Sequence, residues 1–94
     1  LTPPRLDRLV DEQSRLIDIA SQLVRPGGAL VYAVCSLIDR EGSGQIACFL
    51  DRQSHWCTDP LALPVGRVAG GGLILTPAHD GSDGFFIARL ARDR

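Results

Sequence analysis

A short, continuously apolar run constrains the fold of this chain more than any other feature. Residues Ala29 to Val34 show no polar alternation and are partly β-branched, which predicts a strand covered on both faces in the centre of a parallel sheet. Cys35 and Ser36 follow where this strand should end. Because ligands of open α/β sheets bind outside the carboxyl ends of the strands, Cys35 is well placed for chemistry. Its position also fits ordinary packing, since free cysteine is often a small buried apolar residue.

The segments on either side of this strand predict two helices. Apolar residues recur at helical spacing from Leu6 to Val24, so we expect a helix over about residues 4–24 that ends at a Pro-Gly-Gly segment. A second helix is expected to begin near Gly42 or Ser43. Its apolar side would carry Ile46, Ala47, Phe49 and Leu50, whereas Cys48 receives no functional role.

The C-terminal half predicts a long loop followed by two paired strands. Prolines and scattered polar residues indicate a loop over about residues 53–72, held to the body of the protein by Trp56. The glycines at 70–72 are interpreted as a flexible linker, because phosphate-binding loops follow a strand and open a helix. Strands are expected at residues 73–76 and 85–90. The Asp-Gly turns between them predict an antiparallel pair.

Composition limits the classes of protein to consider. The chain has 94 residues with a net charge of −1, which fits one domain without strong electrostatic attraction to nucleic acid. Its three cysteines and two histidines do not form a zinc pattern, so we expect no metal and reduced thiols. No apolar run approaches the ~20 residues of a membrane span. We therefore expect a cytoplasmic protein without a membrane partner.

Short motifs occur in a characteristic order along the chain. They are Pro26-Gly27-Gly28, Leu30-Val31-Tyr32, Cys35-Ser36, Glu41-Gly42, Gln45-Ile46, Leu75-Thr76-Pro77 and Asp83-Gly84-Phe85-Phe86. In this order they resemble the C-terminal part of the Nop/Sun family of RNA cytosine-C5 methyltransferases, and within it the bacterial enzymes that modify ribosomal RNA. The resemblance covers nearly the whole chain. It implies that residues 1–94 are a single partial catalytic domain.

The resemblance implies an α/β fold, the C-terminal portion of a Rossmann-like methyltransferase sheet. That sheet has the strand order 3-2-1-4-5-7-6, with strand 7 antiparallel to the others. This chain would hold strands 5, 7 and 6, and its two helices would cover the two faces. The outer edge of strand 29–34 would then lack its neighbour. Because an unpaired apolar edge invites pairing with another chain, we expect the fragment to self-associate there.

The same resemblance implies a site. Cys35 would be the nucleophile that adds to carbon 6 of cytosine, S-adenosylmethionine would supply the methyl group, and ribosomal RNA would be the substrate. Ser36, His79 and Asp83 are candidates for support on the substrate side. Each also has a structural interpretation, since serine and aspartate commonly order turns. Val34 departs from the family, which usually has threonine before this cysteine.

The motifs that the family uses for cofactor binding are not found in the sequence. There is no glycine-rich turn after a first strand, no acidic residue for the ribose and no Asp-x-Pro-Cys motif. We therefore expect the isolated fragment to be inactive and without bound S-adenosylmethionine. Two alternatives stay open. One is a non-catalytic α/β interaction module that pairs through its free sheet edge, and the other is a methyltransferase acting on DNA or a small molecule.

Overall fold

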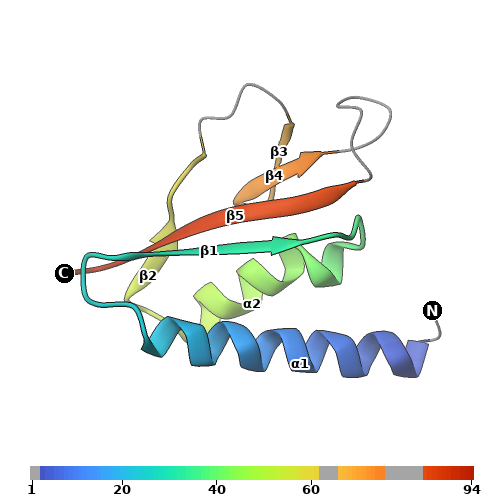
Figure 1. The fold of residues 1–94 in the computed structure, drawn as a ribbon, viewed down its shortest axis with the longest axis horizontal. Helices are drawn as coiled ribbons and strands as arrows, with labels where there is room; N and C mark the ends of the chain where they lie inside the picture. Colours follow the sequence, from blue (N-terminus) through green and yellow to red (C-terminus); the bar gives the residue numbers. More distant parts are fainter. Residues whose placement is uncertain (1–2, 62–65, 76–83) are drawn as a thin grey trace.

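A computed structural model describes residues 3–61, 66–75 and 84–94 of the chain (Figure 1). In chain order these form α1 (Pro3–Gln22), β1 (Ala29–Val34), a 3-10 turn η1 (Asp39–Glu41), α2 (Ser43–Arg52), β2 (Trp56–Thr58), β3 (Arg67–Ala69), β4 (Gly72–Leu75) and β5 (Phe85–Arg92). No helix within these ranges is long and apolar enough to cross a membrane.

The strands form one antiparallel sheet built around β5. Its order is β1-β5-β4-β3, and β2 pairs with the C-terminal part of β5. The β1–β5 ladder runs from the pair Ala29 and Ala91 to the pair Val34 and Phe86. The predicted α/β class and the predicted order of these strands are confirmed, with the last strand antiparallel to both neighbours.

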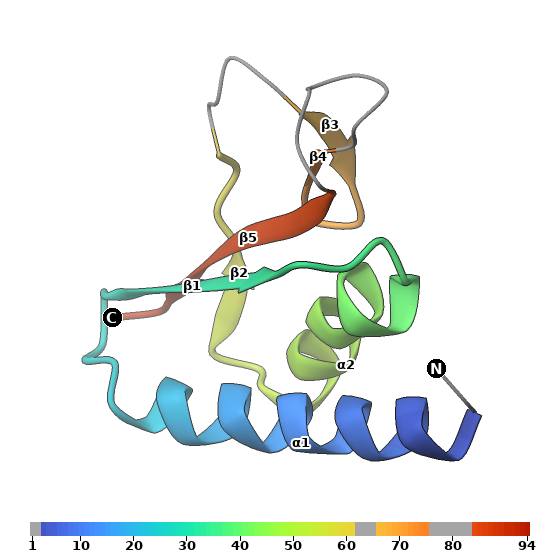
Figure 2. The ribbon, with the colours of Figure 1, turned by 45° about the vertical axis from the view of Figure 1, so that its right-hand side comes forward.

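The core lies on one face of this sheet. Both helices pack there (Figures 1 and 2), because Ile17 of α1 and the apolar side of α2 belong to the same buried cluster as alternate residues of β5. The expectation that the helices cover both faces is therefore wrong. The buried cluster consists of Ile17, Ile46, Phe49, Trp56, Phe86, Ala88 and Leu90. The predicted apolar side of the second helix is largely confirmed, although Ala47 is exposed.

The prediction that β1 is central and covered on both faces is also wrong. β1 lies at the end of the strand order, and within the described residues only β5 pairs with it. Leu30, Tyr32 and Val34 pack against the core cluster, whereas the alternate residues are exposed, among them Val31 at 56%. The apolar run thus has one covered face, because no element described here packs on the other.

The predicted loop at 53–72 contains two short strands, β2 and β3. Trp56 begins β2 and is buried, with its ring edge-to-face against Phe49 at 5.5 Å, so it does hold this segment to the core. Gly70 and Gly71 form the two-residue turn of the β3–β4 hairpin rather than a linker. Their φ angles of 49° and 82° match the left-handed conformation that a tight hairpin turn requires.

Candidate active site

Cys35 lies directly after the last residue of β1. It is a free cysteine with an exposed side chain, as are Cys48 on α2 and Cys57 on β2. The ladder with β5 ends at Val34, so Cys35 is the first residue to leave the sheet. Exposure alone does not set Cys35 apart from the other two cysteines. Its immediate neighbours do.

The side chain of Ser36 forms two hydrogen bonds with the loop that follows Cys35. Its hydroxyl donates to Oε2 of Glu41 at 2.6 Å and accepts from the backbone N–H of Ile38 at 3.1 Å. The serine proton is therefore directed at the protein's own carboxylate. These two bonds determine the path of the chain immediately after Cys35.

Glu41 is the acceptor on which the hydrogen bonds converge. Its side chain is buried, and Oε1 accepts from Nε2 of Gln13 on α1 at 3.0 Å. Its backbone carbonyl accepts from the hydroxyl of Tyr32 on β1. Sequence reasoning placed Glu41 only in a polar turn and gave it no role. The signal available was its place in the Glu-Gly motif that contributes to the family resemblance.

A second layer of amide groups supports this carboxylate. The carbonyl oxygen of Gln13 accepts from Nε2 of Gln45 at 3.3 Å, and the same nitrogen donates to the backbone oxygen of Val10 at 2.7 Å. Gln45 lies on α2 and is 2% exposed. Hydrogen bonds therefore link α1, α2 and η1 to the serine beside Cys35.

Tyr32 contributes a neutral donor from within β1. Burial, together with the nearby Glu41 carboxylate, raises the pKa of Tyr32 to about 12. The phenol is therefore protonated at neutral pH and donates to the Glu41 carbonyl. Since Tyr32 also lies against Phe86, with ring centroids 6.4 Å apart, the strand that leads to Cys35 is anchored on its covered face.

The loop after Cys35 also meets the start of β5. Gly84 is buried with a φ of 91°, a conformation that favours glycine, and a β-carbon there would lie 3.2 Å from Cγ of Leu37.

His79 and Asp83, the other two predicted supporting residues, lie outside the described residues. The structure thus brings Cys35 and Ser36 together with Glu41.

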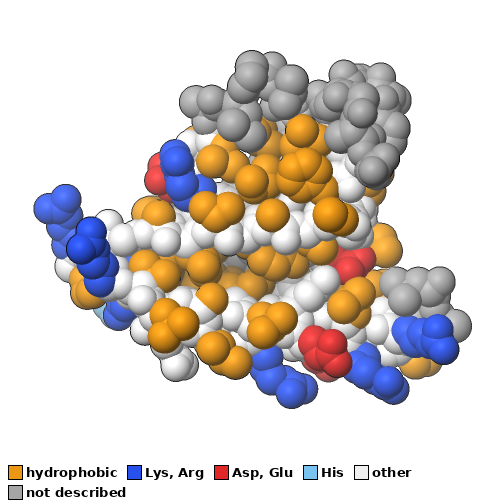
Figure 3. All heavy atoms as spheres, viewed as in Figure 1, with side chains coloured by type: hydrophobic (Ala, Val, Ile, Leu, Met, Phe, Trp, Pro, Cys, Tyr) orange, Lys and Arg blue, Asp and Glu red, His pale blue; other side chains and the backbone are white. Residues whose placement is uncertain are grey.

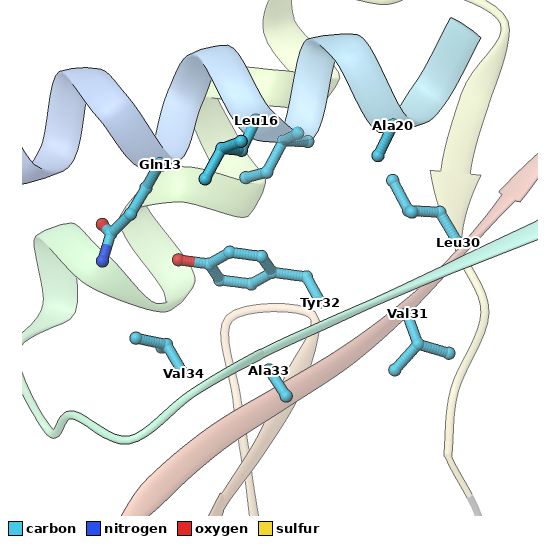
Figure 4. Close-up of a pocket in the computed structure, with 9 residues that line it drawn as sticks. Gln13, Leu16, Ala20, Leu30, Val31, Tyr32, Ala33 and Val34 are labelled. Carbon is cyan, nitrogen blue, oxygen red and sulfur yellow. The ribbon is translucent and has the colours of Figure 1, made fainter. Parts of the chain in front are cut away.

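An apolar pocket of about 310 Å³ separates α1 from β1. In Figure 4, Tyr32 and Leu30 extend toward α1, while Val31 and Ala33 extend to the opposite face of the strand. Figure 3 shows hydrophobic side chains on the surface of this region, and those exposed include Leu16 at 65% and Val31. No carboxylate lines the pocket, so it lacks the acidic group that commonly binds the ribose of an adenosine cofactor.

Metal ligation is not supported by the described part of the chain. It contains no group of three or more His, Cys, Asp or Glu side chains placed to hold an ion. The carboxylate of Glu41 accepts hydrogen bonds from Gln13 and from Ser36, the residue after Cys35. The arrangement therefore presents an accessible thiol on a hydrogen-bonded support.

The family model and the relatives that match this chain all carry the description of a small-subunit ribosomal RNA methyltransferase. The family described as 16S rRNA methyltransferase RsmB/F matches residues 2–91. A ribosomal RNA small subunit methyltransferase B from Xylella fastidiosa is 41% identical over 85 residues, covering 90% of this chain and 20% of the relative. The protein of that name from Thermus thermophilus is 35% identical over 92 residues, covering 98% and 23%. The chain thus spans about a fifth of the length of these relatives.

The fold has counterparts among solved structures. A methyltransferase homolog protein from Pyrococcus horikoshii superposes with a TM-score of 0.87 at 25% identity, covering 98% of this chain and 33% of that chain. The arrangement of helices and antiparallel strands described above is therefore found within a larger protein.

Proposed function

Because the chain belongs to the RsmB/F family of 16S rRNA methyltransferases, we propose that it is the C-terminal catalytic segment of an RNA cytosine-C5 methyltransferase with Cys35 as nucleophile. The observation that carries this proposal is the exposed thiol at the carboxyl end of β1, beside a serine hydrogen-bonded to a buried carboxylate. A ribosomal RNA substrate would place the intact enzyme in the cytoplasm.

The chemistry explains why a thiol is required. Carbon 5 of cytosine is a poor nucleophile, and the thiolate form of a cysteine is the reactive one. When the Cys35 thiolate bonds to carbon 6, the electron pair of the carbon 5–carbon 6 double bond becomes available at carbon 5. Carbon 5 then bonds to the methyl group of a sulfonium donor, whose methyl–sulfur bond breaks so that the donor departs as a neutral thioether. The proton on carbon 5 is then lost to a base. The thiolate is then expelled, and the double bond re-forms.

S-adenosylmethionine would be the methyl donor of the intact enzyme. The residues described here do not fit a site for it, since the pocket beside β1 is lined by apolar side chains with Gln13 and Tyr32. We propose that the isolated 94 residues neither bind the donor nor transfer methyl groups. Calorimetric titration with S-adenosylmethionine tests this, and clear binding by the isolated chain would overturn it.

The nucleophile is tested in the full-length enzyme by Cys35→Ala. Methyl transfer to 16S rRNA, measured by mass spectrometry of the nucleosides, should be abolished, and 5-methylcytidine should be the product of the unaltered enzyme. Cys48→Ala and Cys57→Ala are matched controls, because both cysteines are also free and exposed and both variants should remain active. Methylation by the Cys35→Ala enzyme would eliminate the proposed role.

A trapping experiment tests the covalent step separately. RNA carrying 5-fluorocytidine can accept the thiolate and a methyl group, but it has no proton at carbon 5 to lose, so expulsion of the thiolate is blocked. The unaltered enzyme should therefore form an RNA adduct that survives denaturation. Peptide mapping should place this adduct on Cys35, and an adduct on Cys48 or Cys57 would contradict the proposal.

A further inference from the structure

The elements around Cys35 converge on one buried carboxylate. Glu41 is 5% exposed and accepts from Ser36 in the loop after β1 at 2.6 Å and from Gln13 on α1 at 3.0 Å. Both donors are neutral. Burying a carboxylate against neutral partners costs stability relative to a neutral side chain. Buried charged groups that cost stability in this way are concentrated at functional sites.

We infer that Glu41 is a positioning residue that holds Ser36, and through it Cys35, in the orientation required for attack on the base. The inference rests on the proposed role of Cys35 and adds a residue that acts through another. A single residue connects Glu41 to Cys35. Ser36 directly follows Cys35 in the chain, and its hydroxyl donates to Oε2 of Glu41.

The direction of the hydrogen bonds explains why a carboxylate is needed. Gln13 presents its amide nitrogen to Glu41 because its carbonyl oxygen already accepts from Gln45. The nitrogen of Gln45 in turn donates to the backbone oxygen of Val10. Two donors, Ser36 and Gln13, therefore face position 41, and a carboxylate can accept both. A glutamine there would place its own donor against one of them.

Glu41→Gln in the full-length enzyme is the first test. The expected result is a fall in kcat of about 10- to 100-fold, the scale associated with small misplacements of a reacting group, while KM for RNA stays within about twofold. A variant with unchanged kcat would overturn the inference. Arg40→Gln is the matched control, because Arg40 lies in the same turn but its 2.7 Å ion pair with Asp7 is exposed and contributes little.

Exchanging the two side chains distinguishes positioning from a direct effect of the charge. In the double variant Gln13→Glu with Glu41→Gln, the new glutamine can donate to residue 13 and still accept from Ser36. The new glutamate can accept from Gln45. The exchange should therefore restore kcat to within about threefold of the original if positioning through hydrogen bonds is what matters. If the double variant folds but kcat stays as low as in Glu41→Gln alone, Glu41 acts through its charge and the inference is wrong.

Ser36→Ala provides a test that does not depend on the buried residue. Removing its hydroxyl should lower kcat as Glu41→Gln does, and combining the two changes should cost no more than either alone, because residues acting through one contact are not additive. Wild-type kcat in Ser36→Ala would also overturn the inference.

These variants distinguish failure of the proposed function from failure of the inference about Glu41. Methylation by Cys35→Ala would contradict the role of Cys35 as nucleophile. Loss of methylation in Cys35→Ala, with full activity in Glu41→Gln and Ser36→Ala, would contradict only the positioning role of Glu41.

Discussion

Gly42 lies so close to Phe86 that a β-carbon at position 42 would be 2.9 Å from Cγ of the ring. Phe86 is 1% exposed and pairs with Val34, the residue before Cys35. The short segment between Glu41 and α2 is therefore pressed against the strand that supports the end of β1. A hydrogen is the only side chain that fits at position 42 without displacing this buried ring.

Gly42→Ala should therefore destabilise the protein by about 1–3 kcal/mol, the usual cost of forcing an extra methyl group into a packed core. Chemical denaturation provides the measurement. Ser43→Ala is the control at the next position, since its β-carbon is already present, and it should change the free energy of unfolding by less than about 0.5 kcal/mol. Equal stability of the two variants would show that the ring moves aside freely.

Tyr32 predicts a loss of stability at high pH. Its pKa is raised from 10.0 to about 12 in the folded protein, so between these values the folded state retains a proton that the unfolded state has lost. Stability is then fully present below pH 10 and falls as the pH rises toward 12. The chain contains one tyrosine and no lysine, which makes the titration simple to follow by tyrosinate absorbance.

Tyr32→Phe is the corresponding control for the pH dependence. This variant should lack the part of the stability loss between pH 10 and pH 12 that arises from Tyr32. Because Tyr32 donates to the carbonyl of Glu41, the variant should also be less stable at neutral pH, by about 1 kcal/mol. A tyrosinate midpoint at the ordinary value of about 10 in the folded protein would contradict the prediction.

Gln45 predicts a penalty for an apolar substitution within the core. Gln45→Leu preserves the approximate volume but leaves the part-buried carbonyl of Gln13 without its donor and removes the bond that Gln45 adds to the helical backbone oxygen of Val10. An unsatisfied buried polar group costs about 1–3 kcal/mol, and thermal unfolding should show the loss. Gln22→Leu, at the exposed end of α1, should be close to neutral. A Gln45→Leu protein as stable as the original would mean that these acceptors find other partners.

The features that sequence predicted well depend on neighbours along the chain. The strand at Ala29–Val34 follows from a continuous apolar run, and the helix bearing Ile46 and Phe49 follows from the spacing of its apolar residues. The short strands β2 and β3 do not, since Trp56 becomes part of a strand only by pairing with Arg92. Such long-range pairing is not encoded in a three-residue pattern.

In the candidate site, too, residues identified by their neighbours along the chain were predicted, whereas a residue buried by a long-range contact was not. Cys35 and Ser36 were identifiable because the strand before them was clear and the motif order resembles a known family. Glu41 was missed because a charged residue in a polar turn is normally exposed. Its burial arises from the approach of α1, where Gln13 lies 28 residues earlier in the chain. Only the three-dimensional arrangement makes this carboxylate part of the site.

The free edge of β1 predicts self-association of the isolated chain. Val31 is 56% exposed, and β1 ends the strand order with only one partner among the described residues. Because charged side chains on edge strands oppose edge-to-edge pairing, Val31→Lys should weaken association by about tenfold or more in sedimentation velocity experiments. Val68→Lys is the matched control, since Val68 is 86% exposed on β3 at the opposite end of the order. Association lost only in the Val68 variant would show that the contact lies on β3. An unaltered chain that stays monomeric would contradict the prediction.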